Sequence, residues 1–585
     1  METDWFDVKS KLDAIFYELS QEIDGFTENF RAEIRIADPR FGDFQVNGIL
    51  SFAKKNKKNP RELGAKLFAK AQQSKNLANC SLELSGPGFI NIRLEPDFLQ
   101  RWVCTFYNQC DFKHWFAGKT IVIDYSSPNT AKQMHVGHLR SMIIGESIQR
   151  LLKYCGANVI RDNHLGDWGT QFGILIMAVK RAQIDIFTLN PEKALDTFEQ
   201  LYRDGVALTK QNESFSAEAR RELVALQKGD PENLYIWKTI NETSYRAFDE
   251  IYKQMDVIFD YVLGESFYRD QVDSVCQDLE NLKIAEENQG ALVVFHRNHD
   301  RFKDQPFLIR KSDGASNYGT TDLATVLYRW ENFHADTMIY VTDGRQQDHF
   351  QQLFLTVERW FSAKNIPLPQ LKHVWFGTVL GEDGHAIKTR SGESIRLKQL
   401  IDEGISRALA TVNEKNPDLP PLEQNEIAHI VGTSAIKYAD LSQNRTNNYV
   451  FSWDKMLSFD GNTAPYLLYA VARIHALLRR LKISPNEKRS PKVMAAFSTT
   501  EELALARKLV DFPATIAQVL DDLRPHYLCT YLFELASEFS TFYNANRIIG
   551  EATDVFEKRL LLCQFTLHVL ATGLYLLGIQ KLEQM

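Results

Sequence analysis

Between residues 116 and about 455 the chain alternates between two hydrophobic patterns. Short apolar, β-branched runs, of which Thr120–Asp124 and 158–161 are the clearest, have the length and composition of buried strands. Stretches with helical spacing follow them. This alternation is typical of a doubly wound parallel sheet, so we predict a Rossmann-like α/β core. Two stretches, about 185–255 and 275–310, have the character of a helical and a sheet-like insertion.

The first 115 residues predict a separate α+β module. A helical pattern at 6–19 is followed by a strand-like alternation at 42–49, and Asn59-Pro60 has the composition of a helix start. Two more strands are predicted at 81–84 and Phe89–Leu94, around a glycine-rich turn.

From about residue 456 the strand signals disappear and helical spacing dominates to the end of the chain. The clearest stretches are 466–481, 501–523, 528–543 and 556–577. We therefore predict an all-α domain at 456–585.

Composition limits the possible classes of protein. A chain of 585 residues exceeds one hydrophobic core, and 44% hydrophobic with 24% charged residues is ordinary for a soluble globular protein. We find no uncharged apolar run of membrane-spanning length and no basic secretion signal, so we expect a cytoplasmic protein without membrane contact. The seven scattered cysteines form no C-x-x-C pair, which argues against disulfides and a structural metal site.

Charge excludes one further class. The net charge of −7 and a pI near 6.1 do not fit a general nucleic-acid coat, although positive charge can be concentrated locally. The lysine-rich segment 54–58 is one candidate patch, and a solvated loop explains it equally well.

The densest chemistry follows the strand Thr120–Asp124. A turn at 126–129 leads to His135-Val136-Gly137-His138, which opens a predicted amphipathic helix. A helix start presents free N–H groups and the positive end of a dipole to an anion. The histidines, three apart, share one face, and Gly137 has no Cβ to block a ligand. These residues indicate a site for a nucleotide triphosphate.

The fifteen residues from Ser127 to Ser141 match S-P-N-x-A-K-x-x-H-x-G-H-L-R-S at every fixed position. This segment resembles the HIGH region of the class I aminoacyl-tRNA synthetases, most closely that of the arginyl-tRNA synthetases. The alternative, a core helix whose histidines satisfy neighbours, does not explain a Pro, an Asn, a Lys and two His in one loop. The resemblance implies ATP as substrate, with Mg²⁺ accompanying it.

A second phosphate-binding loop of that family, K-M-S-K-S, is degenerate in this chain. Laid over it, residues 386–390 place Ala386 and Thr389 at the two lysine positions, and Lys388 and Arg390 remain nearby. Residues 163–171 resemble a further family block, N-H-x-G-D-W-G-x-Q, that lines the ATP cleft. The predicted catalytic and ATP-binding residues are Asn129, Lys132, His135, Gly137, His138, His164, Gly166, Asp167, Lys388 and Arg390.

Recognition of arginine needs carboxylates, because a guanidinium offers five donors and no acceptor. Tyr318 and Asp322 resemble the Tyr and Asp of the family's S-D-G-x-x-x-Y-x-x-x-D, which contact the guanidinium. Unaided, Asp322 could be an ordinary helix-start aspartate. The resemblance also implies arginine-binding roles for further residues, which are Asp124, Gln346, and, for the α-groups, Ser127 and Asn129.

Contacts to tRNA are also implied by the resemblance. Residues 459–473 match the family closely, and Tyr466, Tyr469 and Arg473 fall on one helix face that suits stacking on anticodon bases, although a tyrosine stripe is more often core. Asn462, Tyr543 and the terminal Met585 are further candidates in this region. In the N-terminal module, which contacts the tRNA elbow in the family, the candidates are Gln45 and Asn47.

The implied activity is formation of arginyl-adenylate from ATP and arginine, then transfer to the 3′ end of tRNA-Arg by a monomeric enzyme. Members of the family commonly need bound tRNA before they activate arginine. Three rival interpretations are a class I synthetase for another amino acid, a non-catalytic tRNA-binding paralogue and a small nucleotidyltransferase. A neutral substrate would leave the pocket acids unpaired, a paralogue would have lost the histidines, and a nucleotidyltransferase would lack the helical C-terminal domain.

Overall fold

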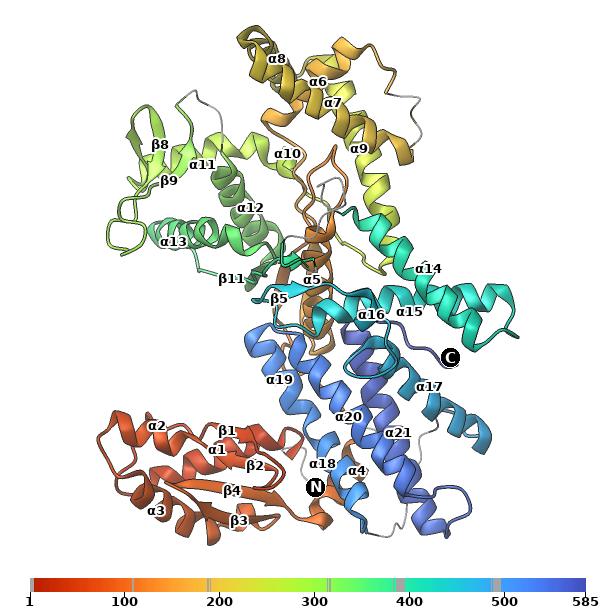
Figure 1. Ribbon diagram of the computed structural model, residues 1–585. Helices are drawn as coiled ribbons and strands as arrows, with labels where there is room; N and C mark the ends of the chain where they lie inside the picture. Colours follow the sequence, from red (N-terminus) through yellow and green to blue (C-terminus); the bar gives the residue numbers. More distant parts are fainter. Residues whose placement is uncertain are drawn as a thin grey trace. The chain divides into compact units, whose positions relative to one another are not determined.

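The computed structural model describes residues 5–107, 110–186, 189, 191–312, 314, 317–381, 383–385, 395–485, 487 and 496–584 (Figure 1). The chain forms two compact units. The first consists of Met1–Asp111, Ser458–Tyr575 and Ile579–Met585, and the second of Phe112–Leu457 and Leu576–Gly578.

The second unit is built on a four-stranded parallel sheet in the order β11-β10-β5-β6. Its strands are β5 (Thr120–Asp124), β6 (Asn158–Asp162), β10 (Thr337–Tyr340) and β11 (Gln370–His373). The register aligns Asp124 with Asp162 on one side and Tyr340 on the other, so the last residues of three strands lie in one row. This row is the carboxyl edge where ligand sites of α/β sheets open. The predicted parallel α/β core is confirmed.

Helices from distant parts of the chain make up much of the rest of this unit (Figure 1). The longer ones are α5 (Val136–Tyr154), α6 (Thr170–Ala182), α12 (Tyr318–Phe333), α13 (Gln347–Ala363), α14 (Leu397–Lys415) and α15 (Pro421–Leu441). The shorter elements are α10 (Glu265–Tyr268), η3 (Arg269–Gln271), α11 (Val272–Asn281), η4 (Gly344–Gln346), α16 (Trp453–Met456) and the paired strands β12 (Val379–Leu380) and β13 (Tyr449–Val450). Val122, Met338, Leu353 and Trp360 are among the fully buried side chains of the core.

Both predicted insertions have the expected type of structure. The first is helical, with α7 (Pro191–Gln211), α8 (Glu213–Gln227) and α9 (Pro231–Gln254). Asp230 caps α9, and Pro231 occupies its first turn, where a missing N–H costs no hydrogen bond. The second contains a three-stranded antiparallel sheet of β7 (Glu286–Asn288), β8 (Ala291–Val294) and β9 (Phe307–Arg310).

In the first unit an antiparallel sheet, in the order β1-β2-β4-β3, packs with short helices. Its elements are β1 (Ile34–Ile36), β2 (Phe44–Val46), β3 (Cys80–Ser85), β4 (Phe89–Leu94), α1 (Val8–Gln21), α2 (Gly48–Lys55), α3 (Pro60–Gln72), η2 (Lys75–Leu77) and α4 (Pro96–Phe106). The predicted strand 42–49 is wrong beyond Val46, where the chain turns into α2. Gly48 permits this turn, because a Cβ there would lie 1.8 Å from the carbonyl oxygen of Arg31.

The remainder of the first unit is helical, as predicted, with α17 (Ala464–Leu481), α18 (Thr500–Val510), α19 (Phe512–Asp522), α20 (His526–Ala545) and α21 (Thr553–Leu576). The pattern at 501–523 predicts one helix, but the structure has two. Pro513 lies in the first turn of α19, and its missing N–H and ring prevent a continuous helix through Asp511.

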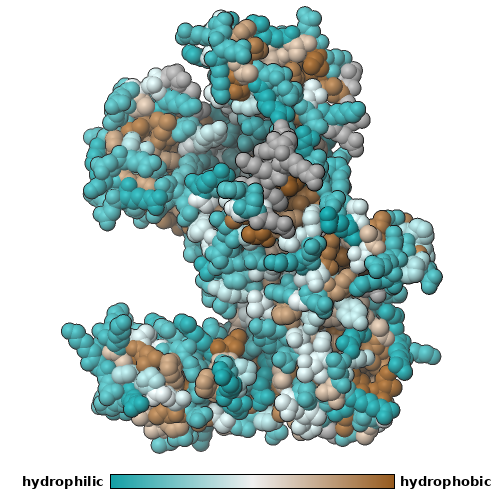
Figure 2. Space-filling model, viewed as in Figure 1, coloured by the Kyte–Doolittle hydropathy of each residue, from teal (hydrophilic) through white to brown (hydrophobic). Residues whose placement is uncertain are grey.

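One helix corrects the expectation that no apolar run reaches membrane-spanning length. Thr553–Leu576 is long and apolar enough to cross a membrane, yet 72% of its apolar window is buried inside the protein. It is therefore accounted for as a core helix. On the face shown in Figure 2, apolar side chains form small separate groups among polar ones.

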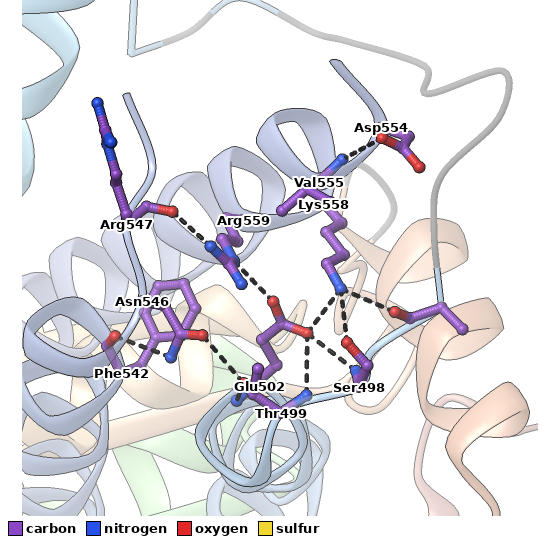
Figure 3. Close-up of polar contacts among 11 residues, drawn as sticks. Ser498, Thr499, Glu502, Phe542, Asn546, Arg547, Asp554, Val555, Lys558 and Arg559 are labelled. Carbon is purple, nitrogen blue, oxygen red and sulfur yellow. Dashed lines mark hydrogen bonds and ion pairs between the residues drawn. The ribbon is translucent and has the colours of Figure 1, made fainter. Parts of the chain in front are cut away.

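A buried ionic cluster joins α18 to α21 (Figure 3). The fully buried carboxylate of Glu502 lies 2.8 Å from Nζ of Lys558 and 2.7 Å from Nε of Arg559. It also accepts the backbone N–H of Ser498 at 2.9 Å. Because every charge in the cluster has an opposite partner, the cost of removing it from water is offset.

Candidate active site

The site is built around the loop that follows β5. Two segments pair here: the N–H of Thr130 donates to the carbonyl oxygen of Gly166 at 3.1 Å, and the N–H of Gly166 donates to that of Pro128 at 3.2 Å. A Cβ at Gly166 would lie 2.0 Å from Oδ1 of Asn129. The glycine therefore allows close approach of the two segments, and the exposed Asn129 is placed beside it.

The two histidines form the cap of α5. Nδ1 of His135 accepts the N–H of Gly137 at 3.0 Å, and Nδ1 of His138 accepts the N–H of His135 at 3.1 Å. Their ring centroids are 4.0 Å apart. A neutral ring that accepts at Nδ1 carries its proton on Nε2, so the pair offers two Nε2–H donors at the helix start. A Cβ at Gly137 would lie 2.8 Å from Cε1 of His135, so this position needs a glycine.

These histidines are neutral donors at physiological pH. Burial, and then the nearby His135, lower the pKa of His138 to about 3. The pKa of His135 is lowered by burial and then by the positive charges of Arg345 and Lys132. Arg345 and Lys132 are therefore candidates to supply positive charge to a phosphate. The ammonium of Lys132 lies 5.1 Å from the ring centroid of Tyr202 in α7. Arg345 was missed by the sequence analysis.

The predicted K-M-S-K-S equivalents Lys388 and Arg390, together with the tRNA candidate Met585, lie outside the described residues. The segment after this loop is anchored to the start of α5. The N–H of Val136 donates to the carbonyl oxygen of Ile395 at 3.2 Å, and the N–H of Leu397 donates to that of Met134 at 2.8 Å.

Three acidic side chains gather on the other side of the site. Asp322 in α12 lies 2.6 Å from Nε2 of His349 in α13. Glu265, at the start of α10, has its pKa raised to about 8 by burial and then by the charges of Asp322 and Asp167. Tyr318, the first residue of α12, is 68% exposed. These three carboxyl groups would favour the binding of a cation, because a positively charged ligand relieves the repulsion among them.

Glu265 was missed by the sequence analysis. Its signal is a single acid within the otherwise apolar and small run Tyr261-Val262-Leu263-Gly264-Glu265-Ser266-Phe267-Tyr268. A charge in such a run is either exposed or functional, and only the fold brings this one within electrostatic range of Asp322.

Asp124 is held by other residues of the protein. Its Oδ2 lies 2.6 Å from a terminal nitrogen of Arg329, and its Oδ1 accepts the hydroxyl of Ser127 at 2.9 Å. Arg329 is fully buried and also pairs with Asp162 at 2.8 Å. The guanidinium that Asp124 faces is thus one of the protein's own. Its contact with the site runs through the half-buried Ser127.

Asp167 is likewise bonded to other residues of the protein. Its buried carboxylate accepts the N–H of Ser266 at 2.8 Å, the hydroxyl of Ser266 at 2.7 Å and that of Tyr245 at 3.1 Å. Both oxygens are therefore bonded within the protein, and the carboxylate fixes the turn that presents Glu265. His164 is half-buried, with Nδ1 2.9 Å from the carbonyl oxygen of Leu263. Gln346 is exposed, three residues before His349.

Most of the predicted anticodon contacts lie together in the first unit. The guanidinium of Arg473 lies 4.4 Å from the ring centroid of Tyr543 and donates to Oδ1 of Asn544 at 2.9 Å. Tyr469 is 53% exposed, and Tyr466 packs on Phe533 with ring centroids 5.4 Å apart. Tyr466 is thus partly a packing residue, whereas Tyr469 is available to a partner.

The other tRNA candidates are less uniform. Asn462 is exposed just before α17. Gln45 donates to Oδ1 of Asn91 on the neighbouring strand at 2.6 Å, which leaves its own carbonyl oxygen as the open group. Asn47 precedes α2, and its buried Oδ1 has no hydrogen-bond partner among the described residues.

Comparison with known proteins accounts for this arrangement. Residues 108–453 match the model of the class I tRNA synthetase (R) catalytic domain, 467–585 that of the DALR anticodon binding domain and 7–94 that of the arginyl tRNA synthetase N-terminal domain. The arginine–tRNA ligase of Nostoc punctiforme is 42% identical over 94% of this chain and 95% of its own. That of Proteus mirabilis is 41% identical over 94% and 95%.

Solved structures agree with these relatives. The arginyl-tRNA synthetase of Plasmodium falciparum superposes with a TM-score of 0.84 at 27% identity, covering 99% of both chains. That of Thermus thermophilus has the same fold, with a TM-score of 0.82 at 23% identity over 99% of this chain and all of its own. The chain therefore belongs to the arginyl-tRNA synthetase family, with a class I catalytic domain and a DALR anticodon-binding domain.

Proposed function

We propose that this enzyme activates arginine between the histidine cap of α5 and the acids of α10 and α12. The observation that carries the proposal is the convergence of Asp322 and Glu265 in one cluster with no arginine or lysine partner recorded for either among the described residues. A guanidinium can donate hydrogen bonds to two carboxyl groups at once through its planar fork, so this pair favours arginine over the compact ammonium of lysine.

In this proposal the substrate lies across the loop after β5. Asp322, Glu265 and Tyr318 bind the guanidinium, with Gln346 beside them, and Ser127 and Asn129 bind the α-ammonium and carboxylate. Asp124, fixed by Arg329, orients the Ser127 hydroxyl. The α-carboxylate then points toward the histidine cap.

ATP is proposed to enter as its Mg²⁺ complex and to lie along the start of α5. The Nε2–H groups of His135 and His138 donate to phosphate oxygens, and Lys132 and Arg345 supply positive charge. Gly137 and Gly166 let the histidine cap and the paired loop keep their shape beside the nucleotide, and His164, Asp167, Lys388 and Arg390 complete the predicted set. A carboxylate oxygen of arginine attacks the α-phosphorus, and the bond to the β-phosphate breaks and releases pyrophosphate. A hydroxyl of the tRNA 3′-terminal ribose then attacks the carbonyl carbon and releases AMP.

The remaining proposals concern partners and organisation. We propose a division into domains at 1–115, 116–455 and 456–585, with tRNA-Arg contacting the first through Gln45 and Asn47. The last domain would read the anticodon through Asn462, Tyr469, Arg473, Tyr543 and Met585, with Tyr466 supporting them. We further propose that the enzyme acts as a monomer in the cytoplasm and activates arginine only with tRNA bound.

The test is charging of total tRNA with each of the twenty amino acids. We expect arginine alone to be attached, and ATP–pyrophosphate exchange to require tRNA-Arg. Asp322→Asn should raise the KM for arginine about a hundredfold, because it removes a charge-assisted pair, and leave the KM for ATP within about twofold. Attachment of another amino acid, or an unchanged KM for arginine in Asp322→Asn, would refute the proposed pocket.

A further inference from the structure

The loop that carries Ser127 and Asn129 has a strained backbone. The φ angles are 73° at Ser126, 45° at Ser127 and 63° at Ala131. Residues other than glycine rarely adopt this left-handed region, because Cβ crowds the backbone. Three such residues within six positions keep their shape only if the surroundings hold them.

Two of the contacts that hold this loop come from one helix of the inserted domain. Oη of Tyr252 lies 2.9 Å from Oγ of Ser126, and Oγ of Ser244 accepts the N–H of Ala131 at 3.0 Å. Both side chains belong to α9, eight residues apart, and hence to the same face of that helix. They bind the two ends of the strained segment.

A second hydrogen bond extends each contact. The hydroxyl of Ser244 donates to the carbonyl oxygen of Ile240 at 2.7 Å, so a lone pair remains for the N–H of Ala131. Oη of Tyr252 accepts from Nδ2 of Asn163 at 3.0 Å and keeps one proton of its own, and either hydroxyl of the Tyr252–Ser126 pair can be the donor. Burial raises the pKa of Tyr252 to about 12, which keeps that proton in place at physiological pH.

Asn163 extends this network to the substrate-binding residue itself. Its Oδ1 accepts the N–H of Ser127 at 3.0 Å, while its Nδ2 is the donor to Tyr252. All of these groups are buried or half-buried, so water does not readily replace a lost partner. Removal of the Tyr252 hydroxyl would release Ser126 directly and free the amide that positions Ser127.

We propose that Tyr252 and Ser244 are positioning residues through which α9 holds the arginine-binding loop in its strained shape and so sets the affinity for arginine. The proposal rests on the arginine-binding roles given above to Ser127 and Asn129. It makes α9 a physical link between the helical insertion and the amino-acid site, without contact to either substrate.

The test compares Tyr252→Phe and Ser244→Ala with two matched controls on α9. The controls are Tyr235→Phe, at a tyrosine that is 58% exposed, and Thr239→Val, whose hydroxyl donates to the carbonyl oxygen of Tyr235 within the helix. The KM values for arginine and ATP and the kcat of aminoacylation are measured for all four with the full-length enzyme and tRNA-Arg.

We expect each test variant to raise the KM for arginine about tenfold, the size that fits the loss of one hydrogen bond, with the KM for ATP changed less than about twofold. The controls should match the wild type. An unchanged KM for arginine, or equal increases for arginine and ATP, would overturn the proposal. Tyr252→Phe keeps its buried ring, so it remains informative even if Ser244→Ala does not fold.

Failure of the underlying site is separately visible. If Asp322→Asn raises the KM for arginine and Tyr252→Phe does not, the positioning role alone is wrong. If neither variant changes it, the arginine pocket has been placed wrongly as well.

Discussion

Oδ2 of Asp322 lies 2.6 Å from Nε2 of His349, so the acid proposed to bind the substrate already has a partner inside the protein. Burial lowers the pKa of His349, but the hydrogen bond and charge of Asp322 outweigh it, and the net pKa is raised. A protonated His349 therefore competes with the substrate guanidinium for the same carboxylate.

The KM for arginine should fall as the pH rises through the folded-state pKa of His349, above its ordinary value of about 6.5. Below that pH the imidazolium neutralises Asp322, and above it the carboxylate is free for the guanidinium. His349→Asn, which keeps a donor but cannot be charged, should abolish this part of the pH dependence. Steady-state kinetics from pH 6 to 8.5 measure it, and an identical profile in the variant would contradict the competition.

Glu265 should release a proton when arginine binds. Its pKa of about 8 means that the free enzyme holds it mostly protonated at pH 7, and a bound guanidinium would favour the ionised form. Calorimetric titration in buffers of different ionisation enthalpy should show nearly one proton more released by the wild type than by Glu265→Gln. Affinity in the wild type should increase as the pH rises toward 8. Equal proton release in both proteins would place Glu265 outside the pocket.

His138 should contribute no acid limb to the activity between pH 5 and 7, because burial holds its pKa near 3. His138→Asn keeps an acceptor for the N–H of His135 and so preserves the helix cap, but it moves the donor away from the phosphates. We expect kcat to fall at least about a hundredfold, with a thermal unfolding midpoint close to that of the wild type. A fall in stability without a fall in kcat would reduce His138 to a capping residue.

The cluster of Glu502, Lys558 and Arg559 should be important for the stability of the helical part of the first unit (Figure 3). Glu502→Gln leaves the buried Lys558 and the partly exposed Arg559 without this carboxylate and should cost about 3 kcal/mol. Glu501→Gln, one residue earlier in α18, is the matched control and should cost less than about 0.5 kcal/mol. Thermal unfolding followed by circular dichroism distinguishes them.

The same cluster predicts a dependence on acid. Burial raises the pKa of Glu502, but the hydrogen bonds from Lys558, Ser498 and Arg559 outweigh it, and the net pKa is lowered. The stabilisation is therefore complete above the unfolded-state pKa of about 4.3 and is lost as the pH falls through the lower folded value. Glu502→Gln should lack this loss, and an equal acid sensitivity in both proteins would contradict it.

Much of the fold is legible in the sequence, since Thr120–Asp124 and the strands after it carry a clear pattern and the helices of the C-terminal part repeat their apolar spacing. The errors in the predicted elements occur where a single residue's backbone determines where a strand or helix ends. At Gly48 the backbone passes so close to Arg31 that the strand ends, and the hydrophobic pattern gives no sign of this contact. At Pro513 the apolar spacing continues, but the proline separates α18 from α19.

The site was less predictable for a different reason. The histidine cap is local in sequence, so Gly137 and His138 could be assigned from spacing. The pocket is assembled from α10, α12 and α13, and neither the presence of Glu265 nor the pairing of Asp322 with His349 follows from any local pattern. The ion pair between Asp124 and Arg329 could not be predicted either, because the two residues are far apart in the sequence.

Arg329 gives the enzyme a resident copy of the chemical group that it must select. The carboxylates of Asp124 and Asp162 form buried ion pairs with this guanidinium, and Asp124 also contacts Ser127 of the proposed substrate-binding loop. Removal of the Arg329 side chain, as in Arg329→Ala, would leave a cavity between the two carboxylates that has the shape of a planar cation. Guanidinium ions added to this variant should bind in the cavity and restore part of the lost aminoacylation activity, whereas ammonium ions of equal charge should not.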